Sequence, residues 1–119
     1  MRLILILLLS CTTSCSFYVR GYQDGQARAK EKYLEAHLSM MRDGIKKYTK
    51  DHGQPPQTLN DLVNANYLSL IPRDPITNEV NWIVVQYDCA LNVNCKMGIK
   101  DVHSASTAKS TKGDMYSDW

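Results

Sequence analysis

The longest patterned stretch of the chain predicts one amphipathic helix over residues 26–51. Its apolar positions recur at steps of four, three, four and three residues, which places them on one stripe of a helix: Leu34, Leu38, Met41, Ile45 and Tyr48. Charged residues, Glu31 among them, are interpreted as lying off that stripe, so one face is apolar. Gly53 can adopt the left-handed conformation that ends a helix, and the prolines at 55–56 prevent its continuation. The stripe could fill a groove on a partner, but packing on the chain's own sheet is favoured.

A short second helix is predicted after residue 58. Thr58 is a suitable N-cap, and Asp61 stands at the capping-box position, where it replaces the more common Glu. Leu59, Leu62 and Val63 would then face inward. The second helix therefore adds to the same apolar core.

The following segments predict a small antiparallel sheet. The prolines within residues 72–75 fix a turn, and the β-branched and aromatic residues at 82–87 predict a strand. Turn-forming residues at 88–94 lead to a return strand at 96–102, and residues 115–119 could close the sheet as a final short strand. The predicted fold class is α+β, with a long N-terminal helix packed on two to three antiparallel strands.

The N-terminal residues have the pattern of a signal peptide for export. Arg2 supplies the positive charge, residues 3–9 are all apolar, and small residues follow. Seven helical residues rise only about 10 Å, far less than the ~30 Å hydrocarbon core of a bilayer, so this stretch does not predict a transmembrane anchor. We therefore expect a signal peptide at 1–14, a tether at 15–25 and a globular domain at 26–119.

A small residue followed directly by Cys suggests a lipoprotein signal, in which that Cys is acylated. Cys11 has the better local match but leaves a very short leader, whereas Cys15 gives a more usual length although Thr12 replaces an aliphatic residue. The number of cysteines left for disulfide pairing favours Cys15, because cleavage there removes Cys11 and leaves Cys89 and Cys95 to pair with each other. Cleavage of an ordinary signal peptide without lipid is the alternative.

The pair Cys89 and Cys95 is expected to form a structural disulfide between the two strands, since an exported protein folds in an oxidising setting. In the chain-entropy model, closing so short a loop is worth roughly 2–3 kcal/mol. A metal site is the alternative, but two cysteines without an adjacent histidine make a poor one.

No catalytic constellation is present in the sequence. The histidines fall in separate elements: His37, His52 and His103. No Ser or Cys has a neighbour suited to activate it, and there is no Gly-rich phosphate loop. Asp74 and Asp101 are interpreted, like Asp61, as cap and turn residues. We therefore expect a non-enzymatic protein without a cofactor, and the net charge of +2 gives no reason to expect a nucleic-acid partner.

Two segments are distinctive, "IPRDPIT" at residues 71–77 and the terminal "YSDW" at residues 116–119. Together with residues 41–53, 59–63, 67–70 and 99–104, they make the chain from Met40 to Trp119 resemble the globular domain of the major, G-type pseudopilin of type II secretion. The resemblance covers about two-thirds of the chain. It implies a pseudopilin-like head and a role in protein secretion through protein–protein docking.

The chain departs from this family at its N-terminus. A typical member is a prepilin that is cut at a Gly-Phe junction and continues as a long apolar helix, which spans the membrane and packs the filament. Here Ser16 precedes Phe17, Arg20 follows within three residues, and residues 21–32 are polar. The resemblance therefore does not extend to the filament-forming helix.

The second departure concerns the family's calcium loop. Thr107 and Lys112 stand where the resemblance places two calcium-binding aspartates. Calcium binds six to eight oxygens and usually more than one carboxylate, so calcium is not expected here. Lys112 can take the place of the cation and reach toward Asp114 or Asp118. The alternative is a rearranged calcium site formed by Ser104, Asp114 and Asp118.

These observations predict a non-enzymatic component or accessory of a type II secretion-like or type IV pilus-like system. Its pseudopilin-like head would dock to other pseudopilin-type or secretion-system proteins from a lipid tether. It would be exported and held at the cell envelope as a membrane-anchored lipoprotein that faces the periplasm or the exterior. The alternative is an envelope lipoprotein that uses the same fold for an unrelated binding role, such as ligand capture.

Overall fold

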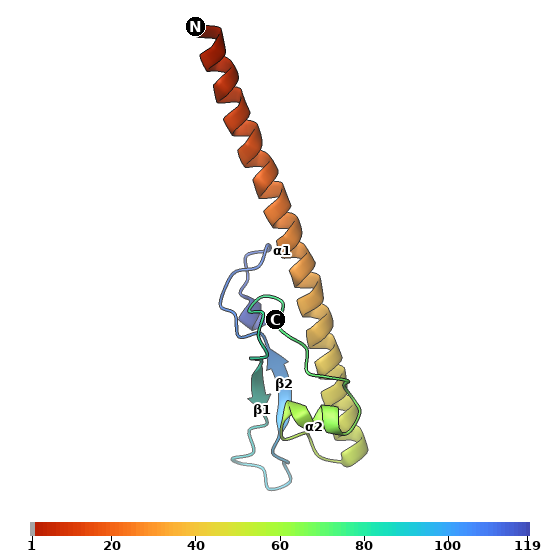
Figure 1. Ribbon diagram of the computed structural model, residues 1–119. Helices are drawn as coiled ribbons and strands as arrows, with labels where there is room; N and C mark the ends of the chain where they lie inside the picture. Colours follow the sequence, from red (N-terminus) through yellow and green to blue (C-terminus); the bar gives the residue numbers. More distant parts are fainter. Residues whose placement is uncertain (1) are drawn as a thin grey trace.

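The computed structural model describes residues 2–119, with side chains from residue 16 onward. Its elements are the helices α1 (Arg2–His52) and α2 (Leu59–Asn64), the strands β1 (Ile83–Gln86) and β2 (Ile99–His103), and the short 3-10 helix η1 (Tyr116–Asp118). α2, the two strands and the C-terminal segment lie side by side along the C-terminal part of α1 (Figure 1). Two helices and a two-stranded antiparallel sheet confirm the α+β fold class.

The sequence predicted that the long helix starts at residue 26, but the helix begins before that residue. Residues 16–25 are also helical, and their side chains are exposed. This segment contains no proline, and each of its two glycines, Gly21 and Gly25, costs a helix only about 1 kcal/mol. Its role as a tether stays a prediction. The predicted signal peptide and the candidate lipidation sites Cys11 and Cys15 lie outside the residues whose side chains are described. Within the described residues, no helix is apolar over a length that could cross a membrane.

The apolar stripe of α1 forms one side of the core, as predicted. Leu34, Leu38, Met41 and Ile45 are buried, and Tyr48 packs against them while half-buried. The other elements supply the rest of the core: Leu62, Leu68, Trp82, Ile99, Val102 and Tyr116. The stripe thus packs on the chain's own elements.

The predicted helix signals also appear in the structure. Gly53 ends α1 with a φ of +69°, the left-handed conformation expected of a residue that follows a helix. The carboxylate of Asp61 accepts hydrogen bonds from the backbone N–H groups of Gln57 at 2.8 Å and Thr58 at 3.0 Å, as in a capping box. These contacts lower the pKa of Asp61, with the Thr58 N–H as the largest cause.

The predicted sheet of two to three antiparallel strands is confirmed, and it has two strands. β1 and β2 pair antiparallel with Val84 opposite Val102, and the register shifts between Val85 and Gln86. Residues 115–119 instead form η1, with a single bridge between Lys109 and Met115. This segment lies between the helix and the sheet, because the Tyr116 hydroxyl donates to Glu31 of α1 and the Trp119 main-chain oxygen contacts His103 of β2.

Candidate functional site

A buried carboxylate of α1 holds the C-terminal segment in place. Glu31 is only 6% exposed, and its two oxygens accept three hydrogen bonds: from the Thr111 backbone N–H at 2.6 Å, the Thr111 hydroxyl at 2.8 Å and the Tyr116 hydroxyl at 2.9 Å. The interpretation of Glu31 as a residue off the buried face is therefore wrong. We call this group of three residues the Glu31 clamp.

The charge state of the clamp follows from its contacts. Burial opposes ionisation of Glu31, but the hydrogen bonds from Thr111 and Tyr116 and the nearby Lys112 ammonium outweigh it and lower the pKa. Burial and the Glu31 carboxylate together raise the pKa of Tyr116 to about 12. Glu31 is therefore an anionic acceptor and Tyr116 a neutral donor at neutral pH.

A second contact joins α1 to β2 and to the last residue. The Arg42 guanidinium donates to Asp101 at 2.7 Å, to the Val102 carbonyl at 2.9 Å and to the Trp119 main-chain oxygen at 2.9 Å. Burial opposes ionisation of Asp101, but the bonds from the Val102 N–H and from Arg42, with the charge of His103, lower the pKa of its carboxyl. Asp101 lies within β2, so its interpretation as a cap or turn residue is wrong.

Asp74 is a turn residue, as predicted, and it is completely buried. Its carboxylate accepts from the backbone N–H of Ile76 at 2.7 Å and from the Ser104 hydroxyl at 2.5 Å. Two residues earlier, the Pro72 carbonyl accepts from the Trp82 indole at 2.8 Å. The segment "IPRDPIT" therefore holds one end of the sheet, where β1 begins after Trp82 and β2 ends before Ser104.

The structure does not gather the candidate calcium ligands into one site. Ser104 donates to Asp74, whereas Asp114 accepts from the Ser110 hydroxyl and, at 3.0 Å, from the Trp119 indole. Asp118 is exposed. Nowhere in the described part of the chain do three or more His, Cys, Asp or Glu residues come together to hold a metal.

Thr107 and Lys112, at which the resemblance implied a loss of calcium ligands, lie in the same loop. Thr107 is exposed. The Lys112 ammonium lies 5.8 Å from the centre of the Trp119 ring, and no ion pair joins it to Asp114 or Asp118 among the described side chains. The Ser110 hydrogen bond lowers the pKa of Asp114 against the cost of desolvation, and Trp119 and Lys112 add to that lowering.

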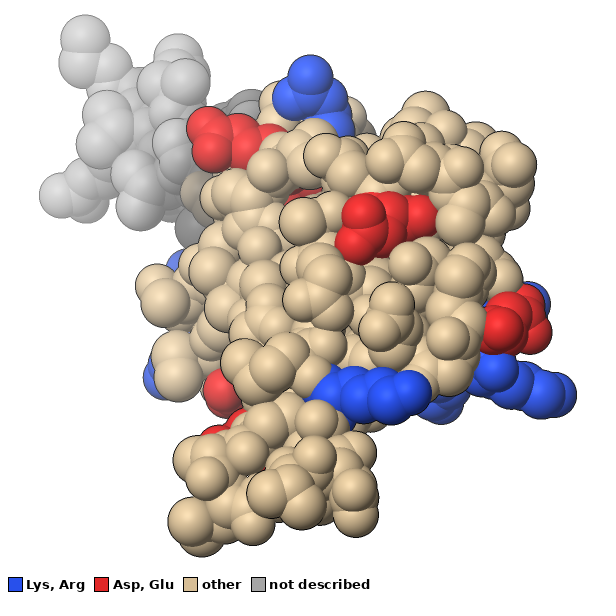
Figure 2. All heavy atoms as spheres, turned by 90° about the horizontal axis from the view of Figure 1, so that it is seen from below, with Lys and Arg blue, Asp and Glu red and all other residues tan. Residues whose placement is uncertain are grey.

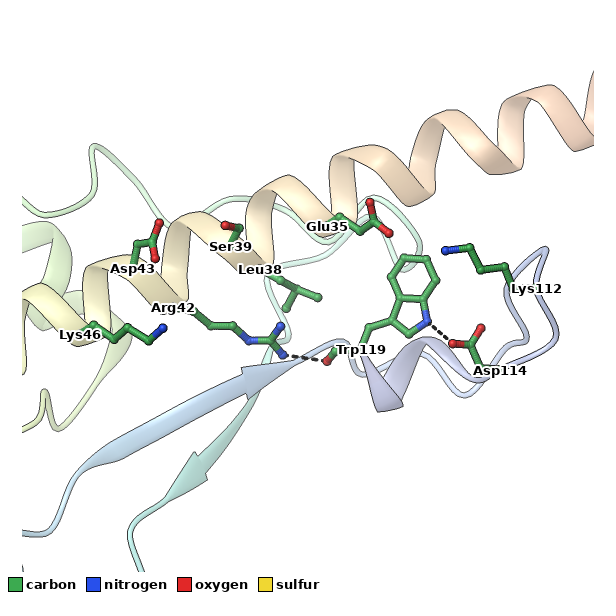
Figure 3. A pocket seen from close by; sticks show the side chains of 9 residues that line it. All are labelled: Glu35, Leu38, Ser39, Arg42, Asp43, Lys46, Lys112, Asp114 and Trp119. Atoms are coloured by element: carbon green, nitrogen blue, oxygen red, sulfur yellow. Dashed lines mark hydrogen bonds between the residues drawn. The ribbon is translucent and has the colours of Figure 1, made fainter.

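A groove of about 470 Å³ lies between α1 and the C-terminal segment, and Figure 3 shows its side chains. Its lining comes from one face of α1 and from the last eight residues: Glu35, Leu38, Ser39, Arg42, Asp43, Lys46, Lys112, Asp114 and Trp119. Leu38 and the indole ring supply apolar surface, and the indole is fixed by its bond to Asp114. Glu35, Asp43 and Lys46 form no side-chain hydrogen bond or ion pair with other described residues, so they are available to a binding partner.

The predicted disulfide is present, with Cys89 and Cys95 joined across the connection between β1 and β2.

The histidines lie apart, as their positions suggested. His37 lies 3.1 Å from the Arg73 carbonyl and His52 lies 3.0 Å from the Tyr48 carbonyl, whereas His103 contacts Asp101 at 3.3 Å. None of these contacts pairs a histidine with a nucleophilic side chain.

Comparison of the chain with protein-family models, with curated proteins and with solved structures finds no match. The site is therefore interpreted from its own geometry.

The sequence did not reveal the roles of Glu31 and Arg42. A signal for the first was present, because Glu31 lies three residues before Leu34 and so continues the buried stripe.

Proposed function

We propose that this chain is a non-enzymatic accessory of a type II secretion-like or type IV pilus-like system. Its head docks to pseudopilin-type domains or other proteins of that system. It takes up no calcium, and a lipid on Cys15, or on Cys11, holds it at the envelope.

One observation carries this proposal: two of the segments that carry the pseudopilin resemblance supply buried, hydrogen-bonded residues of the head. Asp74 of "IPRDPIT" and Tyr116 of "YSDW" are both buried and hydrogen-bonded. Trp119 of "YSDW" lines the groove beside α1. The resemblance thus falls on residues with specific structural roles, which supports a pseudopilin-like head.

The groove is the part of the head best suited to docking. It combines apolar surface from Leu38 and Trp119 with charged groups that have no partner within the described chain. An apolar centre with a polar rim is the usual composition of a protein–protein contact. We therefore place the docking contact at this groove.

In-cell photo-crosslinking tests this proposal. A photo-reactive amino acid at Ser39, inside the groove, is expected to capture pseudopilin-type or secretion-system proteins in mass spectrometry. The same amino acid at Asn60, exposed on α2, is the matched control and should capture few of them. Equal capture at both positions, or capture only of unrelated proteins, would contradict the proposal, and the second result would favour the alternative binding role.

The lipid anchor is tested separately. Metabolic labelling with an alkyne fatty acid should mark the wild-type chain, and the label should be lost in Cys15→Ser, or in Cys11→Ser if that residue is acylated. One acyl chain alone binds a membrane reversibly, whereas multiple acylation should give a stable membrane fraction. Label that persists in the double variant contradicts lipidation at either position.

A further inference from the structure

β1 is an edge strand whose side chains are unusually apolar for an exposed position. It pairs with β2 on one side only, and all four of its residues are exposed, with Ile83 at 52%, Val84 at 38% and Val85 at 37%. Residues 80–87 contain no charged side chain and no proline. Natural edge strands usually carry such residues to prevent pairing with another chain.

The outer edge of β1 also presents free backbone groups. The Tyr87 N–H donates to the Gly98 carbonyl at 3.0 Å, so Tyr87 faces β2. Because backbone groups alternate in direction along an antiparallel strand, those of Val84 and Gln86 face away from β2. Outside the β1–β2 pair, no described residue forms a backbone hydrogen bond with them.

We propose that the outer edge of β1 binds the same edge of a second copy of this chain, in an antiparallel pair centred on Val85. In this register Val84 of each copy exchanges two backbone hydrogen bonds with Gln86 of the other, which uses all the free groups identified above. Val85 then lies opposite Val85, and Ile83 lies opposite Tyr87. The edge is self-complementary, as a two-fold contact requires.

The side chains support this register. Every cross-strand pair is uncharged, and the pairing of an aromatic with a β-branched residue is favourable on a sheet. The connection beyond β1 adds further apolar surface, since Leu91 and Val93 are fully exposed. The end of the head seen in Figure 2 is largely uncharged, with Lys, Arg, Asp and Glu side chains in small separate groups.

The pairing also fixes the relative direction of the two copies. β1 runs roughly in the direction of α1 (Figure 1). An antiparallel β1 pair therefore points the two long helices in opposite directions, so the heads meet and the N-termini lie apart. This contact leaves the groove beside α1 unoccupied, and it stands or falls independently of the proposed docking function.

Sedimentation velocity of the full chain in mild detergent tests the proposal. The wild type should form a concentration-dependent dimer. Val85→Lys places two like charges directly opposite each other in the pair, so its dimer dissociation constant should rise roughly tenfold or more. Leu70→Lys, which adds the same charge at an exposed residue outside β1 and the connection that follows it, is the control and should dimerise as the wild type does.

A mixture experiment excludes a folding defect as the cause. Val85→Glu alone should also dimerise poorly, but an equimolar mixture of Val85→Lys and Val85→Glu should recover a one-to-one heterodimer that native mass spectrometry detects. A monomeric wild type, an unchanged Val85→Lys dimer or failure of the mixture to pair would each overturn the proposal. Association through the apolar N-terminus, for example, would be unaffected by either charge.

Discussion

Replacement of Glu31 should release the C-terminal segment from α1. The Glu31 carboxylate is the shared acceptor of the Thr111 N–H, the Thr111 hydroxyl and the Tyr116 hydroxyl. Glu31→Ala removes all three bonds, and Glu31→Gln keeps one acceptor oxygen but places an amide donor against groups that are themselves donors. We expect both variants to fold with a less stable C-terminal segment.

The loss of stability depends on whether each donor finds another hydrogen-bond acceptor after the substitution. Thr111 is exposed, so its N–H and hydroxyl can bind water after the substitution, whereas Tyr116 is only 5% exposed and its hydroxyl loses its partner. A hydrogen bond to a charged group contributes about 1.5–3 kcal/mol, and an unsatisfied buried donor costs about 1–3 kcal/mol. Recovered hydration of the removed charge offsets part of this loss. We expect about 2–4 kcal/mol for Glu31→Ala and about half of that for Glu31→Gln.

The contribution of Glu31 to stability should also depend on pH. The folded-state pKa of Glu31 is below its ordinary value of 4.5, so its stabilisation is complete above the unfolded pKa and is lost as the pH falls through the folded pKa. The difference in Tm between the wild type and Glu31→Gln should therefore be largest near neutral pH and shrink below about pH 4.

Thermal unfolding followed by circular dichroism measures both effects, and hydrogen exchange at residues 109–116 locates them. Glu35→Gln is the matched control, because Glu35 lies one turn along α1, is exposed and has no hydrogen-bond partner among the described residues. Equal melting temperatures for the two Gln variants, or a Glu31→Gln difference that does not change with pH, would refute the reasoning.

Three further predictions concern the loop, the disulfide and the second α1 contact. Millimolar Ca²⁺ should leave the Tm of the wild type unchanged. Thr107→Asp combined with Lys112→Asp should create calcium-dependent stability if the family alignment is right. A wild type that melts several degrees higher with calcium would contradict this prediction. Cys89→Ala should cost roughly 2–3 kcal/mol, and free thiols at Cys89 and Cys95 in protein prepared from the envelope would show that the bridge does not form there. Arg42→Met should cost about 1–3 kcal/mol in chemical denaturation, and an unchanged unfolding midpoint would show that its bonds contribute nothing net.

The sequence predicted the elements whose signals are local. The stripe from Leu34 to Tyr48 has one period throughout and only one face to bury, so the position of the core on α1 followed directly. Gly53 and the capping residue Asp61 act within a few residues of themselves, and both were placed correctly. The first strand was found because residues 82–87 are rich in β-branched and aromatic side chains, and the second was predicted as the return strand after the turn-forming segment.

The errors concern contacts between residues that are far apart in the chain. Glu31 and Thr111 are separated by 80 positions, and Arg42 and Asp101 by 59. A charged residue looks the same in a sequence whether it faces water or a buried hydroxyl, so only its partner reveals its role. The choice between two and three strands stayed open for the same reason, because the bond from Tyr116 to Glu31 joins residues 85 positions apart.

The Glu31 clamp also explains how the C-terminal segment can be ordered without a cluster of carboxylates in its loop. A calcium site organises such a loop by placing a cation among oxygens that the loop itself supplies. Here the arrangement is reversed: the loop supplies donors, and α1 supplies one anion that lies within the influence of Lys112. A loop held in this way depends on the helix rather than on dissolved calcium, and its order should track the ionisation of Glu31. The positive charge of Lys112 suits this arrangement because it stabilises the anion, whereas an aspartate at the same position would oppose it.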